Sequence, residues 1–412
     1  MDLYEQLQWR GLIKDVSNET KAKELINQEK VKFYCGFDPT GESLTVGHLV
    51  QIVRMMFLEK HGHVPVVLIG GATGLIGDPR QTGERKLLEL QTSLDNAKKI
   101  KEQIKRFLPN AIYVNNYDWI SQIDMITFLR DYGKHFNINY MLAKENVQAR
   151  LETGISYTEF SYMLLQAIDW LHMYQNIDVK IQFGGSDQWG NITSGLELIR
   201  KVTDANHQAV GLASPLLLKS DGSKFGKSET DAIWLDESLT TPYQLYQYFL
   251  NTTDEDVETF LKMLTLLEKS EIETLISTSK SQPEQRIAQK KLAKEITKLV
   301  HGKQALEAAI NVTESLFSGS FKNLTENEFL MASKSLETLE VESEIGLLNA
   351  LSQTKLAQSN REARTFVASG AIMINEQRVV DPTYVLTKND TYYKMYVVLK
   401  RGKKRYSLIK FK

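Results

Sequence analysis

Residues 37–48 bring hydroxyl, imidazole and glycine together where an expected strand meets an expected helix. Thr40, Thr45 and His48 can each donate a hydrogen bond to a phosphate oxygen, and Gly47 lets a ligand approach the backbone closely. The free N–H groups at the start of a helix also favour phosphate. The segment therefore indicates a phosphate site, and a capped helix with incidental polar residues is the alternative.

Two further glycine-containing segments could surround such a ligand. Residues 70–79 hold four glycines after an apolar run, which indicates either close ligand contact or a tortuous turn. Their spacing differs from the dinucleotide fingerprint, so NAD is not predicted. The 221–228 segment places Lys224 and Lys227 three apart, with Ser228 beside the second lysine. Such a loop can close over a polyphosphate and neutralise a leaving group, although similar loops are common on protein surfaces.

A largely apolar helix is expected to begin at the capping box of residues 156–159. Its polar exceptions, Tyr162, Gln166 and Asp169, follow the i, i+4, i+7 spacing and share one face. Polar groups on a buried helix need partners, which could be an internal hydrogen-bond network or a polar ligand. A carboxylate opposite a strand that carries Tyr34 would suit a phenol hydroxyl.

The elements that must position these residues alternate between strand and helix. Apolar runs predict strands at 31–35, 64–69 and 179–183, and helical spacing follows at 49–57 and 188–200. Strand, glycine turn and helix in repetition predict an α/β fold with a doubly wound, Rossmann-like parallel sheet over residues 1–220. Ligands of such sheets lie beyond the carboxyl ends of the strands, where the glycine turns fall.

The second half of the chain has a different pattern. Residues 221–318 are expected to hold the lysine loop and then an α-helical domain. The acidic, aromatic-poor stretch 319–345 is interpreted as a loosely ordered linker. A small α+β domain is expected over 346–412, with a helix that begins at a capping box at Ser359 and a strand near Ile372.

Composition restricts the class of protein. A chain of 412 residues is expected to form two or three domains, and no apolar stretch is long enough to span a membrane. The N-terminus lacks an apolar signal region, and a single cysteine, Cys35, excludes an internal disulfide. We therefore expect a cytoplasmic protein. No metal-ligand cluster is recognised, and neither is a tightly bound cofactor.

Charge is distributed unevenly along the chain. Residues 355–412 hold 13 Lys and Arg against 4 Asp and Glu, whereas the rest of the chain holds 37 against 47. A basic end on an acidic body favours contact with a polyanion, and a solvated charged end is the alternative.

Taken together, these segments closely resemble bacterial tyrosyl-tRNA synthetases over nearly the whole chain. The segment 45–48 stands where that family has its HIGH motif, and 224–228 matches its KMSKS loop in the form KFGKS. Residues 34–40, 70–79, 155–160 and 184–191 are similar to further family segments. Residues 359–378 resemble a small RNA-binding domain that also occurs in a ribosomal protein.

The resemblance implies a tyrosine–tRNA ligase that uses ATP with Mg²⁺ as a substrate. It implies tyrosine and tRNA(Tyr) as the other substrates, and a homodimer. Tyr34 and Asp169 would bind the phenol hydroxyl of tyrosine. The residues that would bind its ammonium group are Asp78, Tyr162 and Gln166, and Asp38, Gln182 and Gln188 would line the same pocket. The residues that would face ATP are Gly36, Gly47, His48, Gly185, Asp187 and Lys227. Those that would act on the departing pyrophosphate and in catalysis are Thr40, Thr45, His48, Lys224, Lys227 and Ser228. The tRNA backbone would be bound by Arg361, Arg364, Lys400, Arg401, Lys403, Lys404 and Arg405.

Thr45 departs from the family pattern because it occupies the first histidine position of HIGH. One hydrogen bond to a charged group is worth roughly 1.5–3 kcal/mol, so activation could be about tenfold slower. This leads to the hypothesis of a secondary synthetase paralogue. The alternatives are a catalytically weak or silent RNA-binding homologue and a tryptophanyl relative. Against the latter stands the pair Tyr34 and Asp169, because an indole offers no hydroxyl.

Overall fold

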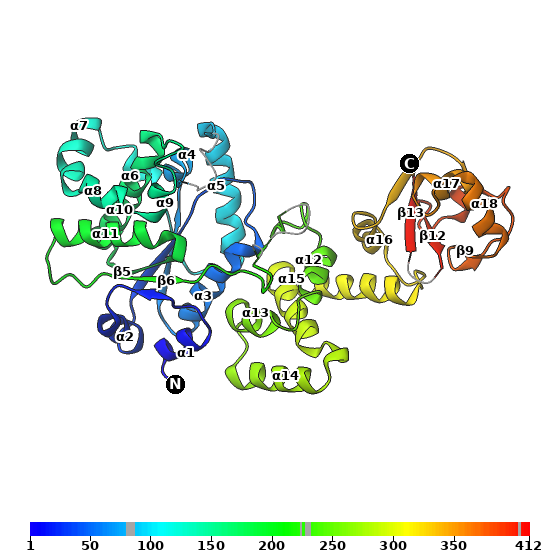
Figure 1. Ribbon diagram of the computed structural model, residues 1–412, viewed down its shortest axis with the longest axis horizontal. Coiled ribbons are helices and arrows are strands. Elements are labelled where there is room, and N and C mark those ends of the chain that lie inside the picture. The colour runs from blue at the N-terminus through cyan, green and yellow to red at the C-terminus, as the bar shows by residue number, and fades with distance from the viewer. Residues whose placement is uncertain (80–86, 223–224, 227–231, 403–404) are drawn as a thin grey trace. The chain divides into compact units, whose positions relative to one another are not determined.

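The computed structural model describes residues 1–79, 87–222, 225–226, 232–402 and 405–412 (Figure 1). The chain divides into two compact units. The first comprises Met1–Leu235 and Thr253–Ala288, and the second comprises Asp236–Thr252 and Gln289–Lys412. The expected domain boundary at residue 220 therefore differs from this division, because residues 221–235 and the helices near residue 260 group with the first unit.

The first unit is built on a six-stranded sheet in the order β1-β6-β5-β2-β3-β4. The strands are β1 Asp15–Val16, β2 Lys32–Phe37, β3 Val64–Ile69, β4 Ile112–Asn115, β5 Val179–Gly185 and β6 Val210–Ser214. All neighbours pair in parallel except β1 and β6. The expected doubly wound sheet is confirmed. Strand order reverses between β2 and β5, the place where such sheets bind ligands.

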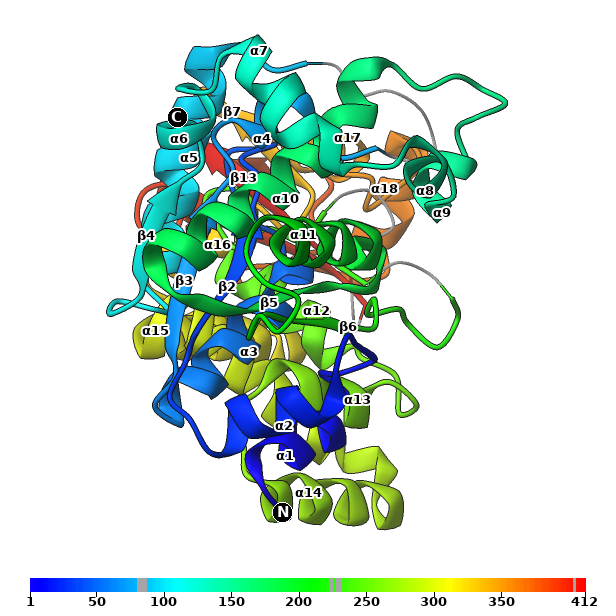
Figure 2. The ribbon, with the colours of Figure 1, turned by 90° about the vertical axis from the view of Figure 1, so that its left-hand side faces the viewer.

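Helices cover both faces of this sheet. Figure 2 looks onto α10 Tyr157–Ile177 and α11 Trp189–Val202, which pack on the face that carries Tyr34. On the opposite face, Arg54 of α3 Leu49–Lys60 lies 4.3 Å from the ring centre of Phe183 in β5. Alternation along β2 therefore directs Tyr34 to one layer and its neighbours to the other. The remaining helices of this unit are α1 Leu3–Trp9, α2 Glu19–Asn27, α4 Thr73–Ile76, α5 Leu90–Lys105, α6 Tyr117–Ile120, α7 Met125–Thr127, α8 Ile138–Leu142, α9 Glu145–Gln148, α13 Val257–Leu264 and α14 Lys269–Ser281.

The second unit combines helices with a five-stranded sheet in the order β10-β9-β12-β13-β7. Its strands are β7 Thr338–Val341, β9 Ile372–Ile374, β10 Gln377–Arg378, β12 Tyr396–Arg401 and β13 Arg405–Phe411, and β8 Ile345–Gly346 pairs with β11 Val385–Leu386. The helices are α12 Pro242–Leu250, most of α15 Ile287–Ser318, α16 Glu326–Ser333, α17 Leu347–Gln353 and α18 Asn360–Ala368. The expected helix after Ser359 is confirmed, since Ser359 caps α18.

The interpretation of 319–345 as a loosely ordered linker is wrong for most of its length. Phe321, Leu324 and Phe329 are buried in a cluster with residues of β12 and β13. The strand β7 pairs in parallel with β13. The acidic composition concealed a few well-spaced apolar side chains, and these are sufficient to dock a helix on the sheet.

No helix within the described ranges has both the length and the apolar character needed to cross a membrane.

Candidate active site

The carboxyl ends of β2 and β3 bring Asp38 and the glycine turn 70–74 together. A Cβ atom at Gly70 would lie 2.0 Å from Asp38 Oδ1 and 2.4 Å from Thr73 Oγ1. Any side chain at Gly70 would therefore displace the carboxylate. Thr73 Oγ1 donates to Asp38 Oδ1 at 2.7 Å, and the Tyr162 hydroxyl donates to Asp38 Oδ2 at 2.8 Å. These bonds join β2, α4 and α10.

A second carboxylate, Asp169 of α10, is buried and accepts two hydrogen bonds. Asn116 Nδ2 lies 2.9 Å from Oδ2, and Trp119 Nε1 lies 2.8 Å from Oδ1. Burial nevertheless raises the pKa of Asp169 to about 8. The carboxyl group is thus poised to change its charge near neutral pH.

Tyr34 lies beside this carboxylate and is 1% exposed. No group in the described part of the chain partners its hydroxyl. Burial, followed by the negative charge of Asp169, raises the pKa of Tyr34 well above its usual value. The Tyr34 ring packs edge-on against that of Trp170, the residue after Asp169, with 6.2 Å between the ring centres. An unpaired buried hydroxyl beside a carboxyl group is expensive unless a ligand uses both.

A third carboxylate, Asp78, accepts from Gln188 Nε2 at 2.7 Å and from Asn191 Nδ2 at 3.1 Å. Burial raises the pKa of Asp78 to about 6, and these two hydrogen bonds oppose that rise. Asp78 is therefore mostly ionised at pH 7. Asn191 Nδ2 also lies 3.1 Å from Gln166 Oε1, so the network reaches α10.

Two predicted nucleotide-facing glycines are exposed and uncrowded. Among the described residues, a Cβ atom at Gly36 would meet only Leu68, at 3.7 Å, and one at Gly47 would meet only the Thr45 hydroxyl, at 3.5 Å. Internal packing therefore does not demand glycine at either position, whereas close approach of a ligand would. Gly185 differs, because a Cβ atom there would lie 2.5 Å from Asp187 Oδ1.

Thr45 holds the imidazole of His48. The Thr45 backbone N–H donates to His48 Nδ1 at 3.1 Å, and Thr45 Oγ1 lies 3.1 Å from the same atom. Because Nδ1 accepts from the backbone, the neutral ring carries its proton on Nε2 and presents that nitrogen as a donor. Thr40, Gly47 and His48 are all exposed, as a phosphate site requires.

Lys224, Lys227 and Ser228 lie outside the described residues, but the two residues between these lysines do not. The Phe225 ring packs edge-on against Phe260 of α13, with 4.9 Å between centroids. Gly226 has a φ of +85°, and a Cβ atom there would lie 3.2 Å from the Gly47 nitrogen. Gly226 therefore lies beside the segment 45–48.

The structure brings Tyr34, Asp38, Asp78, Tyr162, Gln166, Asp169 and Gln188 into one connected neighbourhood at the switch point. Gln182 is buried in β5 nearby in the sheet, where it pairs in register with Tyr34. Sequence reasoning missed the residues that support this neighbourhood, namely Thr73, Asn116, Trp119 and Asn191. A signal existed for Asn116, since it directly follows β4, a strand that was not recognised.

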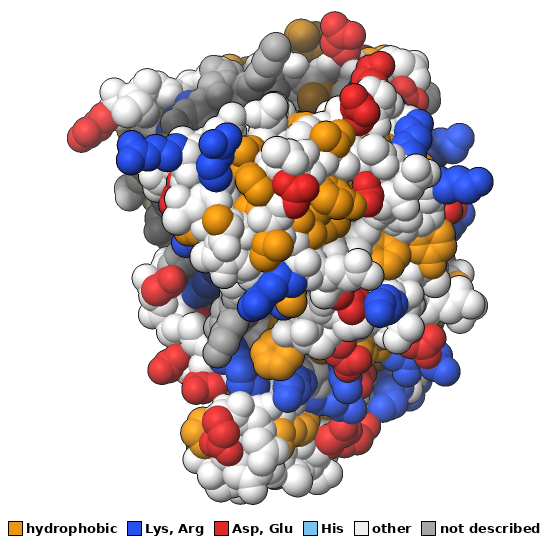
Figure 3. Space-filling view, turned by 90° about the vertical axis from the view of Figure 1, so that its right-hand side faces the viewer, with side chains coloured by type: hydrophobic (Ala, Val, Ile, Leu, Met, Phe, Trp, Pro, Cys, Tyr) orange, Lys and Arg blue, Asp and Glu red, His pale blue; other side chains and the backbone are white. Residues whose placement is uncertain are grey.

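The predicted tRNA-binding cations have different surroundings. Arg361, Arg364 and Arg405 are exposed. In contrast, Arg401 donates to the Leu356 carbonyl and lies 4.6 Å from the Phe366 ring centre, so its guanidinium makes contacts within the protein. The remaining members of this set are Lys400, which lies 5.2 Å from the Tyr406 ring centre, and Lys403 and Lys404, which are outside the described residues. On the face shown in Figure 3, Lys and Arg side chains form separate groups among acidic and apolar ones.

The doubly wound sheet with this site at its switch point is the fold of class I aminoacyl-tRNA synthetases, and a family model assigns the chain to that class. The family model described as "tRNA synthetases class I (W and Y)" matches residues 26–318, and a tyrosine–tRNA ligase C-terminal domain matches 328–409. A C-terminally truncated mitochondrial tyrosyl-tRNA synthetase from Aspergillus nidulans has a TM-score of 0.70 and 29% identity, over 77% of this chain and 94% of that one.

Curated relatives specify the family further. A tyrosine–tRNA ligase from Onion yellows phytoplasma is 53% identical, and one from Geobacillus stearothermophilus is 49% identical, each over the full length of both chains. The chain belongs to the tyrosine–tRNA ligase family. A tryptophanyl-tRNA synthetase from Encephalitozoon cuniculi shares the fold at a TM-score of 0.56 but only 12% of the sequence.

Proposed function

We propose the following division of labour for this tyrosine–tRNA ligase, which forms tyrosyl-adenylate from tyrosine and ATP and then transfers tyrosine to tRNA(Tyr). The observation that carries the proposal is the unpaired Tyr34 hydroxyl beside Asp169. The substrate phenol would accept a hydrogen bond from Tyr34 and donate one to Asp169. Both buried groups would then have a hydrogen-bond partner in the substrate. Phenylalanine would leave both unpaired. The principle used here takes tyrosyl-tRNA synthetase as its own example of such rejection.

The ammonium group of tyrosine would be bound by Asp78, Tyr162 and Gln166. Asp78 is the strongest of these partners, because its pKa of about 6 leaves it negatively charged at pH 7. Asp38 would support the group through Tyr162, to which it is already hydrogen-bonded. Gln182 and Gln188 would line the pocket. Opposite charge at one end and hydrogen bonding at the other would fix the direction of the amino acid.

ATP, as its magnesium complex, would lie along the exposed backbone at Gly36 and Gly47, with Gly185 and Asp187 at its nucleoside end. His48 would donate from Nε2 to the phosphates, and Thr45 would hold it in that orientation. Thr40, Lys224, Lys227 and Ser228 would bind the departing pyrophosphate. The tyrosine carboxylate then attacks the α-phosphorus in line, so positioning and charge stabilisation supply the catalysis without a covalent enzyme intermediate.

ATP–pyrophosphate exchange tests this assignment. Exchange is expected with tyrosine and is expected to be far weaker with phenylalanine, tryptophan or no amino acid. Comparable exchange with phenylalanine would contradict the roles of Tyr34 and Asp169. The full-length likeness to curated tyrosine–tRNA ligases favours this active enzyme over a silent RNA-binding homologue.

Thr45 supports the separate hypothesis of a secondary paralogue with slower activation. Replacing Thr45 with histidine would add a second imidazole near the phosphates, so exchange is expected to accelerate by about tenfold. An unchanged or lower exchange rate would contradict that hypothesis. A lower rate would indicate that the contact of Thr45 with His48 contributes more to catalysis than a second imidazole would.

We further propose a homodimer, with the association surface on the first unit. The segment from α7 to the start of α10 exposes large apolar side chains: Met125 is 75% exposed, Ile126 66% and Tyr157 67%. Such a gathering on one segment marks an association surface. Replacing Ile126 and Tyr157 with glutamate is expected to yield monomers in light scattering, and a dimer that persists would contradict the assignment. We place the enzyme in the cytoplasm, where its tRNA and ATP are found.

A further inference from the structure

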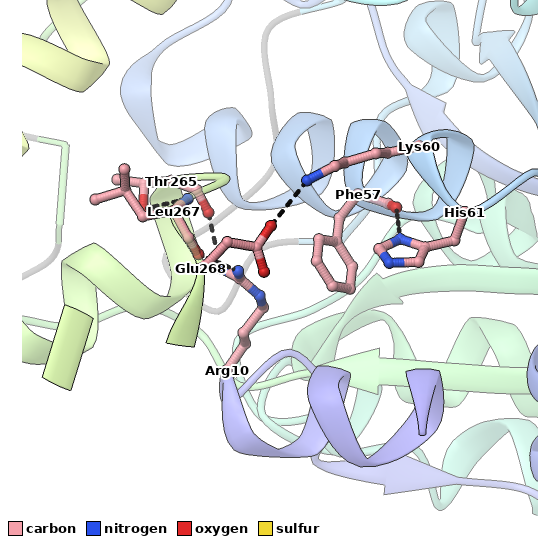
Figure 4. Close-up of polar contacts among 7 residues, drawn as sticks. All are labelled: Arg10, Phe57, Lys60, His61, Thr265, Leu267 and Glu268. Carbon is pink, nitrogen blue, oxygen red and sulfur yellow. Dashed lines mark hydrogen bonds and ion pairs between the residues drawn. The ribbon is translucent and has the colours of Figure 1, made fainter. Parts of the chain in front are cut away.

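Arg10, directly after α1, is buried and bound to a distant part of the first unit. Its Nη1 donates to the Lys262 carbonyl at 3.0 Å and to the Thr265 carbonyl at 2.9 Å, and its Nη2 donates to the Leu267 carbonyl at 2.5 Å. Figure 4 shows the side chain reaching from α1 toward the segment that holds Thr265 and Leu267. Only 4% of the residue is exposed.

The acceptors of Arg10 lie at the carboxyl end of α13. The last carbonyls of a helix have no intrahelical partners, and a cation there also interacts favourably with the helix dipole. Arg10 therefore caps α13 from outside the helix. Its guanidinium carbon also lies 4.6 Å from the ring centre of Phe57 in α3. One side chain thus ties α13 to α1 and α3.

The position of α13 matters for the lysine loop. Phe260 of α13 is buried and contacts the Phe225 ring, and Phe225 stands between Lys224 and Lys227. The next residue, Gly226, lies against the backbone of Gly47. Because α3 begins directly after His48, Arg10 connects the helix that holds Phe260 with the helix that follows the phosphate-facing segment 45–48.

We propose that Arg10 is a positioning residue for tyrosyl-adenylate formation, which acts through Phe260 and Phe225 on the lysine loop. This inference rests on the proposed role of the loop in binding the departing pyrophosphate. The competing explanation is a helix cap that contributes to stability alone. The two differ in what the removal of Arg10 does to the turnover of folded protein.

The variant Arg10→Met keeps the buried stem but removes the five donors and the charge. The matched control is Lys60→Met, which breaks the neighbouring exposed ion pair with Glu268, at 3.0 Å, and leaves the cap of α13 intact. We expect kcat for pyrophosphate exchange to fall about tenfold in Arg10→Met, as for the loss of one charge-assisted hydrogen bond. The Kd of tyrosine is expected to stay within about twofold in both variants, and Lys60→Met to keep its kcat.

A double-mutant cycle with Phe225→Leu tests the route. If Arg10 acts through Phe225, the double variant is expected to lose little more activity than the more impaired single variant. The proposal would be overturned if the fold-losses in kcat of the two single variants multiplied in the double variant. It would also be overturned if Arg10→Met lowered Tm but left kcat unchanged. Where Arg10→Met does not fold, Arg10→Lys takes its place in the cycle. Lys227→Ala distinguishes the proposed role of the loop from the proposed role of Arg10. If Lys227→Ala is fully active, the loop does not act in pyrophosphate binding. If Lys227→Ala is impaired but Arg10→Met is not, only the proposal for Arg10 is wrong.

Discussion

The hydroxyl of Tyr34 has opposite effects on stability and on catalysis, and Tyr34→Phe separates them. In the free protein this hydroxyl is buried without a partner in the described part of the chain. An unsatisfied buried polar group costs about 1–3 kcal/mol. Removing it is therefore expected to stabilise the protein and to raise Tm by about 2–4 °C for each kcal/mol. Such a gain in stability with a loss of function is the trade-off expected at an active site.

Binding of tyrosine changes in the other direction. The variant loses one neutral hydrogen bond to the phenol, worth about 0.5–1.5 kcal/mol, while Asp169 still accepts from the substrate. The kcat/KM for tyrosine is expected to fall by about 2- to 13-fold. The value for phenylalanine is expected to remain the same, because phenylalanine leaves the Tyr34 hydroxyl unpaired in any case. Discrimination between the two amino acids therefore falls by the same factor.

The assay combines thermal melting with pyrophosphate exchange on both amino acids. Tyr4→Phe is the matched control, because the Tyr4 hydroxyl is also buried without a described partner but lies in α1. It is expected to raise Tm without changing either kcat/KM. A Tyr34→Phe enzyme that melts earlier, or that loses phenylalanine activity along with tyrosine activity, would refute the reasoning.

Three further predictions concern the remaining parts of the site and the basic unit. The Kd of tyrosine is expected to fall about eightfold from pH 7 to 8.5, because the phenol donates to ionised Asp169 and a pKa of about 8 leaves little of this carboxyl group ionised at pH 7. Equilibrium dialysis at several pH values measures this change. A Kd that does not change with pH, or that changes equally in Asp169→Asn, would contradict the prediction. Gly36→Ala is expected to raise the KM for ATP at least about tenfold with an unchanged Tm, since among the described residues its Cβ atom would meet only Leu68. Gly70→Ala is expected to raise the KM for tyrosine instead, because its Cβ atom displaces Asp38. Exchange kinetics with each substrate varied in turn would contradict the assignment if the two effects were reversed. Replacing the exposed Arg361 and Arg364 with alanine is expected to weaken tRNA binding and to reduce the dependence of log K on log salt concentration by about 1 for each arginine, while pyrophosphate exchange stays unchanged. Filter binding at several salt concentrations measures this slope. An unchanged slope would exclude phosphate contacts by these residues.

Periodicity was sufficient for the parts of this fold that are locally regular. The runs that became β2, β3 and β5 are apolar because those strands are buried between helices, and they were recognised for that reason. In contrast, all four residues of β4 are only partly buried, so its pattern is weak. The stretch 319–345 was misjudged for a related reason, because its average composition is polar although its few apolar side chains are buried.

In the site, too, local spacing predicts some features and contacts between distant residues are not predicted. The shared face of Tyr162, Gln166 and Asp169 follows from helical spacing alone. Their partners do not, because Asn116 is 53 residues from Asp169 and Asp38 is 124 residues from Tyr162. Contacts between such distant positions depend on strand order, which no local pattern encodes. The role of Gly70 likewise became apparent only when Asp38 was found where a Cβ atom would lie.

The strand β13 lies between β12 and β7 in the sheet of the second unit. The residues of β7 lie 70 positions earlier in the chain than the residues of β13 with which they pair, for example Thr338 with Leu408, so during translation β7 has no partner until β13 has been made. A nascent chain that stops early would present an unpaired strand edge and the apolar underside of α16, both of which promote aggregation. Synthesis of β13 therefore covers the edge of β7 and the apolar side of α16 in one step.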